Sequence, residues 1–560
     1  MKKLLLLTTM LFATLFVGCS ESGLTLLMPE YNITITITSL NTDVKMGEKG
    51  SFTITSDMAV VNDLVVEVSS DKPEIATVPA TVTIAKGSKT VNGEFSAVSV
   101  GKATLTISCK NEGIVINNPS TEVSVSKDGG NQEKPEVEVP ATGTFLERMK
   151  GAKIGGNLVI DNIQKVANGL PGLFKDGRYM IKFKQPLDHS NKSSETFTQR
   201  VIVSIVANDK PVVFVTQGYG FGDGWNFESS SYTEELVDLL DCNQVVVEHR
   251  FFEESTPSPR NWKYHTIENE VNDLHRINLV LREVFKGQKF ISTGRSKGGQ
   301  TAIYYEAYFP KDIDIAVPYV APICYQLNDP RHAAFLKTVG DATRRNKIKA
   351  LQQEMFDRRD ELVPMFKNLY NASDFTVDMD IIFDLCVLEY SFMCWQYNPY
   401  AGIPSTSISN KELLNELNKC GASYYSPDRD PSFIMNVRHD IGCYGYDVTQ
   451  FTNTVITQAQ ADRWIEDIAT PADGHDIQFD PTAGQKVKAF LQGNTTEKMI
   501  FIYGEYDAWS AAAVDKAFFS GKSNMFRYDA PGGDHSTFIG SFNSSTKTEI
   551  INKIKGWLKE

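Results

Sequence analysis

The residues best suited to chemistry are a serine, an aspartate and a histidine that follow one another along the chain. Ser296 stands between glycines in GRSKG (294–298), which matches the G-x-S-x-G pattern of a strand–turn–helix elbow. Asp507 comes directly after the apolar run of IFIYGEYDAWS, and His535 lies in YDAPGGDHSTF. A serine hydroxyl becomes a nucleophile when an imidazole takes its proton and a carboxylate orients that imidazole. We therefore expect Ser296, Asp507 and His535 to be catalytic.

Simpler roles are open to the same residues. Ser296 could occupy a tight turn only, Asp507 could cap a helix, and His535 could lie on a surface loop. Glu505 and Asp534 are rival acids, because each lies within two residues of Asp507 or His535. The order serine, acid, histidine and the position of each residue after an apolar run favour the catalytic interpretation.

An acyl-transfer site also needs N–H donors for the oxyanion of its intermediate. The amide of Lys297, the residue after the nucleophile, is the first expected donor. The second should come from a loop after an earlier strand, and TQGYG (216–220) is the glycine-containing loop available there. We expect the second donor among Gln217, Gly218 and Tyr219.

The elements that must position these residues begin near Thr144. Apolar runs of strand length alternate with helical stretches, including a predicted helix over 267–286, which is typical of a parallel sheet covered on both faces. Residues 144–560 should thus form an α/β-hydrolase domain. The strand pattern is interrupted over about 324–497, where the sequence is helical. We expect this insertion to form a cap over the sheet that determines which substrates are accepted. The expected strands lie at 211–218, 244–252, 289–294, 315–323, 498–504 and 525–533.

A different organisation is predicted before that domain. Residues 31–127 contain about seven short alternating runs, which indicates a β-sandwich. This part resembles the immunoglobulin-like modules of bacterial surface proteins, which serve mostly as spacers. The segment 128–143, rich in Gly, Pro and Glu, should be an extended linker.

The first residues have the pattern of an export signal. Two lysines precede an apolar run that ends at Gly18 before Cys19, and the run is too short for a membrane span. This resembles a bacterial lipoprotein signal, so we expect a signal peptide over 1–18, lipidation of Cys19 and a tether over 19–30. The protein should reside in the cell envelope, held at a membrane by its lipid, on a side that the sequence leaves open.

Composition removes several classes of function. The 560 residues carry a net charge of −13, which argues against nucleic acid as a partner. The eight cysteines include no CxxC pair, and disulfide pairing cannot be read from their spacing. No phosphate loop, dinucleotide fingerprint or HExxH motif occurs, so we expect neither a cofactor nor a metal.

Several stretches resemble the secreted bacterial tripeptidyl aminopeptidases of the PS-10 peptidase family, which are distantly similar to lysosomal prolyl carboxypeptidase. The matching stretches span most of residues 145–560. The resemblance implies an α/β-hydrolase fold, a triad at the three residues chosen above, and release of tripeptides from oligopeptides. The stretches are FKQPLDHSN, TFTQR, TQGYG, EHRFFEESTP, STGRSKGGQTAIYYEAYFPKDIDIAVPYVAP, YGEYDAWS and APGGDHST.

An aminopeptidase needs a carboxylate that pairs with the ammonium group of its substrate at a fixed distance from the nucleophile. Glu248, Glu253 and Glu254 at a strand end, and Glu505 near the expected acid, are the candidates. Each could equally be a structural or solvated carboxylate.

Two other classes of function remain open at this stage. The same triad would serve a carboxylesterase or lipase, since the fold does not fix the substrate. A surface binding protein, with the hydrolase fold as an inactive scaffold, is the third reading. The ordered serine, acid and histidine favour an enzyme over the third reading.

Overall fold

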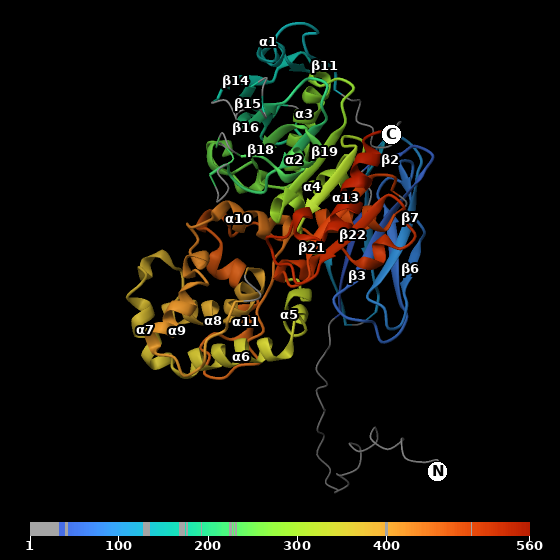
Figure 1. Cartoon of the computed structure of the whole chain (residues 1–560). Coiled ribbons are helices and arrows are strands. Elements are labelled where there is room, and N and C mark those ends of the chain that lie inside the picture. The colour runs from blue at the N-terminus through green and yellow to red at the C-terminus, as the bar shows by residue number, and fades with distance from the viewer. Residues whose placement is uncertain are drawn as a thin grey trace, which may run out of the picture. The chain divides into compact units, whose positions relative to one another are not determined.

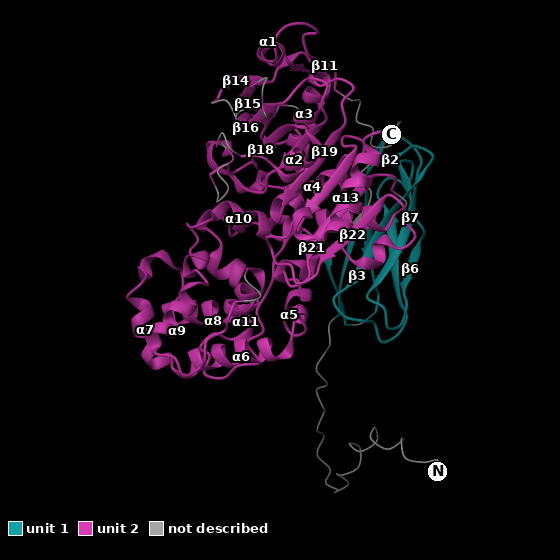
Figure 2. Cartoon of the chain, in the orientation of Figure 1, with its two compact units in different colours: residues 1–130 teal, residues 131–560 magenta. Residues whose placement is uncertain are grey.

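The structure is a computed structural model in which the chain forms two compact units, residues 1–130 and 131–560 (Figure 2). The predicted signal peptide, Cys19 and the tether lie outside the described residues. No helix among the residues described is long and apolar enough to cross a membrane. The structure describes residues 33–39, 43–111, 113–126, 135–166, 174, 177–191, 193–222, 227, 229, 232–397, 401–493 and 495–560.

The first unit is a sandwich of two five-stranded sheets, ordered β5-β7-β3-β1-β9 and β2-β10-β8-β4-β6. Alternate residues of its strands point inward, and side chains of both sheets, such as Phe52 and Leu105, form one buried cluster. This is consistent with the expected immunoglobulin-like sandwich. Its strands are β1 (Ile33–Ser39), β2 (Asp43–Lys45), β3 (Lys49–Ser56), β4 (Leu64–Ser70), β5 (Ala76–Thr77), β6 (Thr81–Ile84), β7 (Thr90–Ala97), β8 (Gly101–Ser108), β9 (Ile114–Asn118) and β10 (Ser120–Ser126).

The second unit contains a nine-stranded sheet in the order β14-β15-β16-β18-β17-β19-β20-β21-β22. From β18 to β22 neighbouring strands run parallel, and β17, β18 and β20 are buried along their whole length. Sequential strands with one exchange, β18 before β17, confirm the expected α/β-hydrolase sheet. The strands are β14 (Ile160–Lys165), β15 (Gly177–Pro186), β16 (Thr196–Ile205), β17 (Val212–Thr216), β18 (Asn243–Val247), β19 (Phe290–Arg295), β20 (Ile315–Tyr319), β21 (Lys498–Gly504) and β22 (Met525–Ala530).

Helices cover both faces of this sheet (Figure 1). Residues of α3 and α4 join the cluster on one face, and residues of α2 and α13 join the cluster on the other. Because both faces of the sheet are buried, the sequences of its strands are continuous apolar runs. The helices are α2 (Glu235–Leu240), α3 (Ile267–Val284), α4 (Lys297–Tyr308) and α13 (Ser544–Trp557); a small sheet of β11 (Val137–Glu138), β12 (Lys153–Ile154) and β13 (Asn157–Leu158) lies beside α1 (Phe145–Lys150) in the sequence.

The insertion between β20 and β21 is helical, as expected for a cap. Figure 1 shows α6 to α9 gathered in a lobe beside the sheet. Its helices are α5 (Arg331–Leu336), α6 (Ala342–Asp357), α7 (Arg359–Lys367), α8 (Met379–Gln396), α9 (Asn410–Asn418), α10 (Pro431–Asn436), α11 (Gln458–Ala461) and α12 (Thr482–Gln492), with the turns η5 (Val437–Ile441) and η6 (Ile465–Ala469).

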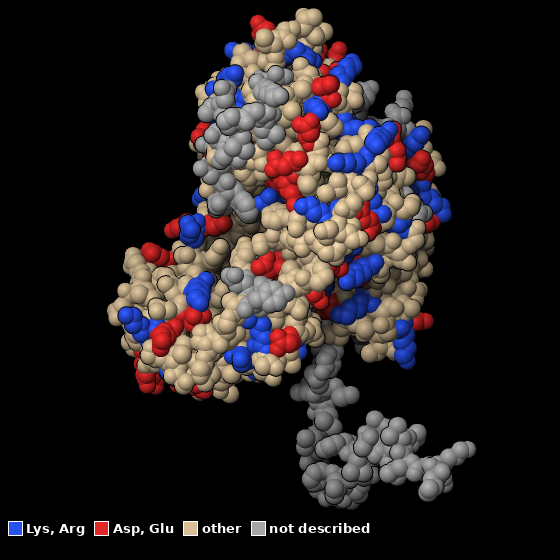
Figure 3. Space-filling model, viewed as in Figure 1, with Lys and Arg blue, Asp and Glu red and all other residues tan. Residues whose placement is uncertain are grey.

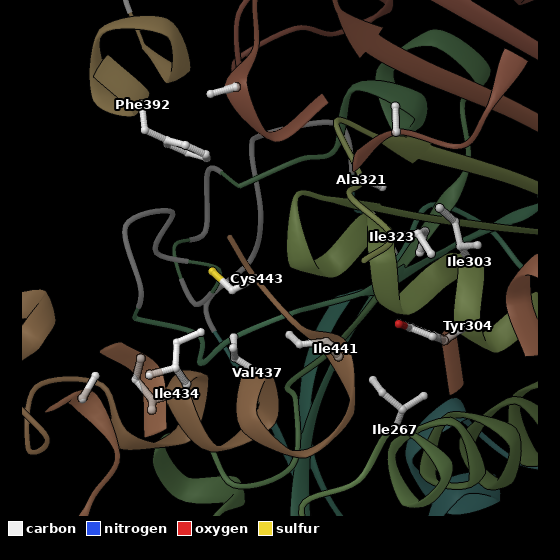
Figure 4. Packing of buried hydrophobic residues seen from close by; sticks show 14 of the residues in the cluster. Ile267, Ile303, Tyr304, Ala321, Ile323, Phe392, Ile434, Val437, Ile441 and Cys443 are labelled. Atoms are coloured by element: carbon white, nitrogen blue, oxygen red, sulfur yellow. The ribbon is translucent and has the colours of Figure 1, made fainter. Parts of the chain in front are cut away.

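A shared apolar cluster fixes the cap to the sheet domain. Ile434, Val437 and Ile441 from the α10–η5 segment belong to the same buried cluster as Ile303 and Tyr304 of α4 (Figure 4). Burial of such side chains contributes roughly 1.5–3 kcal/mol each, so the cap is an integral part of the unit.

Charged side chains of both signs are interspersed over the face shown in Figure 3.

Candidate active site

Ser296 occupies the turn between β19 and α4, at the position the G-x-S-x-G pattern predicts. Its backbone angles, φ 53° and ψ −124°, are disfavoured for a residue with a side chain. The amide of Ser296 donates to Tyr319 O on the neighbouring strand at 2.9 Å. The fold thus holds the serine in a strained conformation that presents its hydroxyl beyond the strand end.

The flanking glycines are required by close backbone approach. A Cβ at Gly294 would lie 2.4 Å from the carbonyl carbon of Gly298, and one at Gly298 would lie 2.7 Å from Thr216 O. Contacts this short do not occur in folded proteins, so a side chain at either position would push β17, β19 and α4 apart.

Asp507 and His535 come to Ser296 from the ends of the last two strands. Asp507 follows β21 and is fully buried, and His535 lies in the loop after β22 and is 8% exposed. The amide of His535 donates to Gln396 O at the end of α8 at 2.9 Å. The histidine loop is therefore attached to the cap as well as to the sheet.

The three side chains form one hydrogen-bonded chain. The Ser296 hydroxyl donates to His535 Nε2 over 2.8 Å, and His535 Nδ1 donates to Asp507 Oδ2 over 2.9 Å. Asp507 also accepts from the amide of Trp509 and the hydroxyl of Ser510, both at 2.9 Å. Asp507 therefore caps a helix and also bonds with the histidine, so its two expected roles, helix cap and triad acid, are compatible.

The rival acids are engaged elsewhere. Glu505 accepts from the amide of Gly532 at 2.7 Å. Asp534 accepts from the amide and hydroxyl of Ser536, at 2.9 and 2.5 Å. Asp507 is the acid that contacts the ring of His535.

The expected oxyanion donors lie next to Ser296, but not all their amides are free. The amide of Gln217 donates to Val247 O at 3.2 Å, and that of Gly218 donates to the Gln217 side chain at 2.9 Å. The amide of Lys297 opens α4, where a helix has no internal acceptor. Lys297 therefore stays the first expected donor, and Gln217 is corrected because its N–H donates to β18 at the sheet edge.

The side chain of Lys297 does something the sequence did not indicate. Its ammonium donates to Gly218 O at 2.6 Å and lies 5.6 Å from the ring centre of Tyr219. Burial lowers the pKa of Lys297 to about 7. The residue after the nucleophile thus fastens the 217–219 loop to the start of α4.

A cavity of about 800 Å³, here called the chamber, lies over Ser296 and His535. The cap supplies most of its remaining wall, including residues of α8 and of the segment 420–464. Its size is that of a small-molecule or peptide site.

Of the four glutamates expected to bind a substrate amine, Glu253 lines the chamber. Its carboxylate pairs with Arg200 at 2.5 Å and accepts from the amide of Gly222 at 2.9 Å. Glu248 is fully buried, and it pairs with the same arginine. Glu248 is therefore a structural counter-ion, which corrects its assignment to the substrate.

The other two glutamates also lie outside the chamber lining. Glu254 is exposed and pairs with Lys182 at 3.0 Å. Glu505 is committed to the Gly532 amide, as described above. Neither residue is part of the chamber lining.

Sequence reasoning missed three carboxylates of the chamber, those of Glu234, Asp430 and Glu389. Glu389 on α8 lines it and accepts from the hydroxyls of Tyr444 and Tyr446. The available signal was a single acidic residue within the apolar run CVLEYSFMCW (386–395). An ionisable residue in an apolar helix needs a partner or a function.

In the residues that the structure covers, no group of His, Cys, Asp or Glu is arranged to hold a metal ion. The seven described cysteines are all unpaired.

Strand order, elbow and the Ser–His–Asp arrangement define an α/β-hydrolase with a serine at its centre. A family model described as PS-10 peptidase S37 matches residues 173–420. The prolyl tri/tetrapeptidyl aminopeptidase of Streptomyces mobaraensis is 28% identical over 401 residues, covering 68% of this chain and 80% of the relative. These two matches support a likeness to the PS-10 peptidase family and indicate a serine peptidase.

Two of the solved structures that match have low sequence identity to this chain. Proline iminopeptidase of Mycobacterium smegmatis has a TM-score of 0.35 at 9% identity, covering 67% of this chain and 98% of its own. The peroxisomal alpha-beta-hydrolase Lpx1 of Saccharomyces cerevisiae has a TM-score of 0.31 at 10% identity, covering 68% and 88%.

Proposed function

We propose that the protein is an exported exopeptidase of the tripeptidyl aminopeptidase type that uses Ser296, His535 and Asp507 as its catalytic triad. The observation that carries the proposal is the hydrogen-bonded chain from Asp507 to the Ser296 hydroxyl at the edge of the capped chamber. The relative from Streptomyces mobaraensis, a prolyl tri/tetrapeptidyl aminopeptidase, supports the type of substrate.

Acylation follows from the positions of these atoms. Ser296 Oγ attacks the scissile carbonyl while its proton passes to His535 Nε2, and Asp507 stabilises the imidazolium through Nδ1–H. The amide of Lys297 and a second N–H from the loop after β17 meet the oxyanion, and the ammonium of Lys297 holds that loop in place through Gly218 O. His535 then gives its proton to the leaving amine, and an acyl-enzyme remains.

Deacylation runs the same steps with water. His535 takes a proton from the attacking water, the second tetrahedral intermediate forms on the same amides, and the proton returns to Ser296 Oγ as the peptide acid leaves. The chamber would hold the released N-terminal peptide. A closed cap limits the number of residues on that side of the bond, which favours short products over internal cleavage.

The test uses three substrates and two proteins. An unblocked tripeptidyl chromogenic amide, its N-acetylated twin and a simple acyl ester are offered to the wild type and to Ser296→Ala. We expect the unblocked peptide alone to be cut, with kcat at least about 10³-fold lower in the variant. Ser544→Ala, an exposed serine of α13, is the matched control and should behave as wild type.

Other outcomes would change the conclusion. Hydrolysis of the ester and the blocked peptide by wild type only would keep the triad and make the enzyme an esterase or lipase. Activity that survives Ser296→Ala would refute the triad.

The lipid anchor is proposed from the sequence around Cys19 alone. Labelled fatty acid should enter the wild-type protein and not Cys19→Ser, and the variant should leave the membrane fraction. Equal labelling of both proteins would refute lipidation at this cysteine.

A further inference from the structure

Most charged groups that line the chamber are already neutralised within the protein. Glu253 pairs with Arg200 at 2.5 Å, and Glu234 pairs with Arg295 at 3.2 Å. Each of these two carboxylates therefore already contacts an arginine. A substrate cation would have to compete with an arginine for either of them.

Glu389 differs from these two carboxylates in its partners. Tyr446 donates to Glu389 Oε2 at 2.8 Å, and Tyr444 lies 3.1 Å from both carboxylate oxygens. Tyr446 is in turn hydrogen-bonded to Tyr425 at 2.8 Å, which fixes its hydroxyl. Among the ion pairs of the described residues, none involves Glu389, so its carboxylate keeps acceptor capacity for a donor that enters the chamber.

Aromatic rings line the way from the triad to Glu389. The ring of Trp509 lies 6.3 Å from that of His535, and the ring of Tyr444 lies 5.3 Å from Trp509. Phe392 stacks on Tyr444 at 4.0 Å and stiffens this wall. Three residues of extended peptide span roughly 10 Å, which is the scale of two such ring-to-ring steps.

We propose that Glu389, with Tyr444 and Tyr446, forms a binding site for an ammonium group of the peptide substrate. The proposal rests on the peptidase function proposed above. An ammonium has three donors and a full charge, and it fits a carboxylate flanked by tyrosine rings through charge-assisted hydrogen bonds and cation–π attraction. The cation could be the free N-terminus or the side chain of a lysine before the scissile bond, since both present the same group.

Electrostatics at Glu389 agree with this role. Burial raises the pKa of Glu389 to about 7, which marks a carboxylate that lacks a compensating cation. A bound ammonium would supply that cation and lower the pKa. Binding should therefore be coupled to loss of a proton from Glu389 near neutral pH.

Binding to an inactive protein tests the site without requiring hydrolysis. Ser296→Ala and Ser296→Ala/Glu389→Gln are titrated by calorimetry with a free tripeptide, with its N-acetylated twin, and with an N-acetylated tripeptide ending in lysine. We expect Glu389→Gln to weaken one of the two cationic ligands about 10- to 100-fold. The neutral ligand should change less than threefold.

The two cationic ligands separate the sources of the ammonium. Loss for the free tripeptide alone assigns Glu389 to the N-terminus, and loss for the lysine peptide alone assigns it to that side chain. Either result supports the site. Equal affinity of both proteins for all three ligands would overturn it.

Matched variants guard against simple disruption of the cap. Tyr446→Phe removes one donor and keeps the ring, so it should weaken the same ligand by a smaller factor. Glu253→Gln tests the carboxylate that already has an arginine, and a loss there as large as in Glu389→Gln would overturn the assignment.

In active protein, the Glu389 effect should appear in KM more than in kcat. If Ser296 proves dispensable for hydrolysis, the peptidase proposal fails, and the calorimetric result still decides the ammonium site.

Discussion

The chamber has two sides that are built in different ways. The sheet side, around Ser296 and Gly218, depends on backbone: a strained serine, glycines in close approach and amides at the start of α4. The cap side, around Glu389 and Tyr446, depends on side chains from α8 and from a segment more than fifty residues later. The comparison suggests that the sheet side fixes the reaction and the cap side fixes the substrate.

This difference leads to separable expectations. Changes on the sheet side should lower kcat for every substrate, because they alter the transition-state contacts. Changes on the cap side should act on the affinity for particular substrates. A cap variant that lowered kcat for all substrates equally would break the distinction.

The largest effect is expected at Asp507. Asp507→Asn should lower kcat about 10⁴-fold, because asparagine cannot hold the His535 tautomer and its charge. The amide of Trp509 still finds an oxygen at this position, so thermal unfolding should change little. Steady-state kinetics with the unblocked tripeptide and a melting curve measure both.

Asp534→Asn is the matched control for this change. Its carboxylate accepts from the amide and the hydroxyl of Ser536, and the variant should retain activity within threefold of wild type. Equal losses in the two variants would remove Asp507 from its assigned role.

The next effect concerns the oxyanion loop. A Cβ at Gly218 would lie 2.5 Å from the amide nitrogen of Gly298, so Gly218→Ala must displace the loop from α4. We expect kcat to fall about 10²- to 10³-fold with a smaller change in KM. Gly402→Ala, in a cap loop with nothing within 4 Å of the new methyl, should have wild-type kinetics. An active Gly218→Ala enzyme would place the second oxyanion donor elsewhere.

A smaller effect should follow from Lys297→Met, which removes the hydrogen bond to Gly218 O. We expect kcat to fall about tenfold, as for loss of one positioning hydrogen bond. Because burial lowers the pKa of Lys297 to about 7, the unfolded chain binds more protons from pH 7 to 10. Wild-type stability should therefore rise with pH in that window, and the variant should lack this rise. Denaturant unfolding at pH 7 and pH 9 measures the difference, and parallel pH dependence would contradict it.

The smallest effect concerns stability at the cap side. The folded protein keeps the proton of Glu389 up to about pH 7, whereas the unfolded chain releases it at lower pH. Wild-type stability should thus decline from about pH 4.5 to 7 relative to Glu389→Gln. Glu254→Gln is a control for which the pH dependence of stability should have the opposite sign, because the hydrogen bond with Lys182 lowers the pKa of Glu254. Identical pH profiles of wild type and Glu389→Gln would show that the carboxylate is solvated.

Much of the sheet side could be predicted from the sequence because its signals are local. Five consecutive residues define the elbow, and Asp507 and His535 each follow an apolar strand. The positions of β17 to β22 along the chain and the helical nature of the insertion also follow from periodicity. The fold and the Ser–His–Asp geometry thus match what was expected from those stretches.

The cap side could not be predicted in the same way. Glu389 and Tyr446 meet only after α8 and the later segment pack together, and no spacing in the chain announces that contact. The glutamates expected from EHRFFEEST are next to a strand end, but Arg200, the cation that Glu248 and Glu253 share, comes from β16. Long-range pairing of this kind decides which carboxylates are free.

The backbone conformation of Ser296 affects how the thermal stability of this protein can be raised. Glycine would adopt φ 53° and ψ −124° without strain, so Ser296→Gly should relieve a conformation that costs about 1–3 kcal/mol. Selection of variants for thermal stability alone would therefore enrich the inactive Ser296→Gly variant. Selection of stabilised forms of this protein must therefore score turnover at every round, or it will discard the nucleophile first.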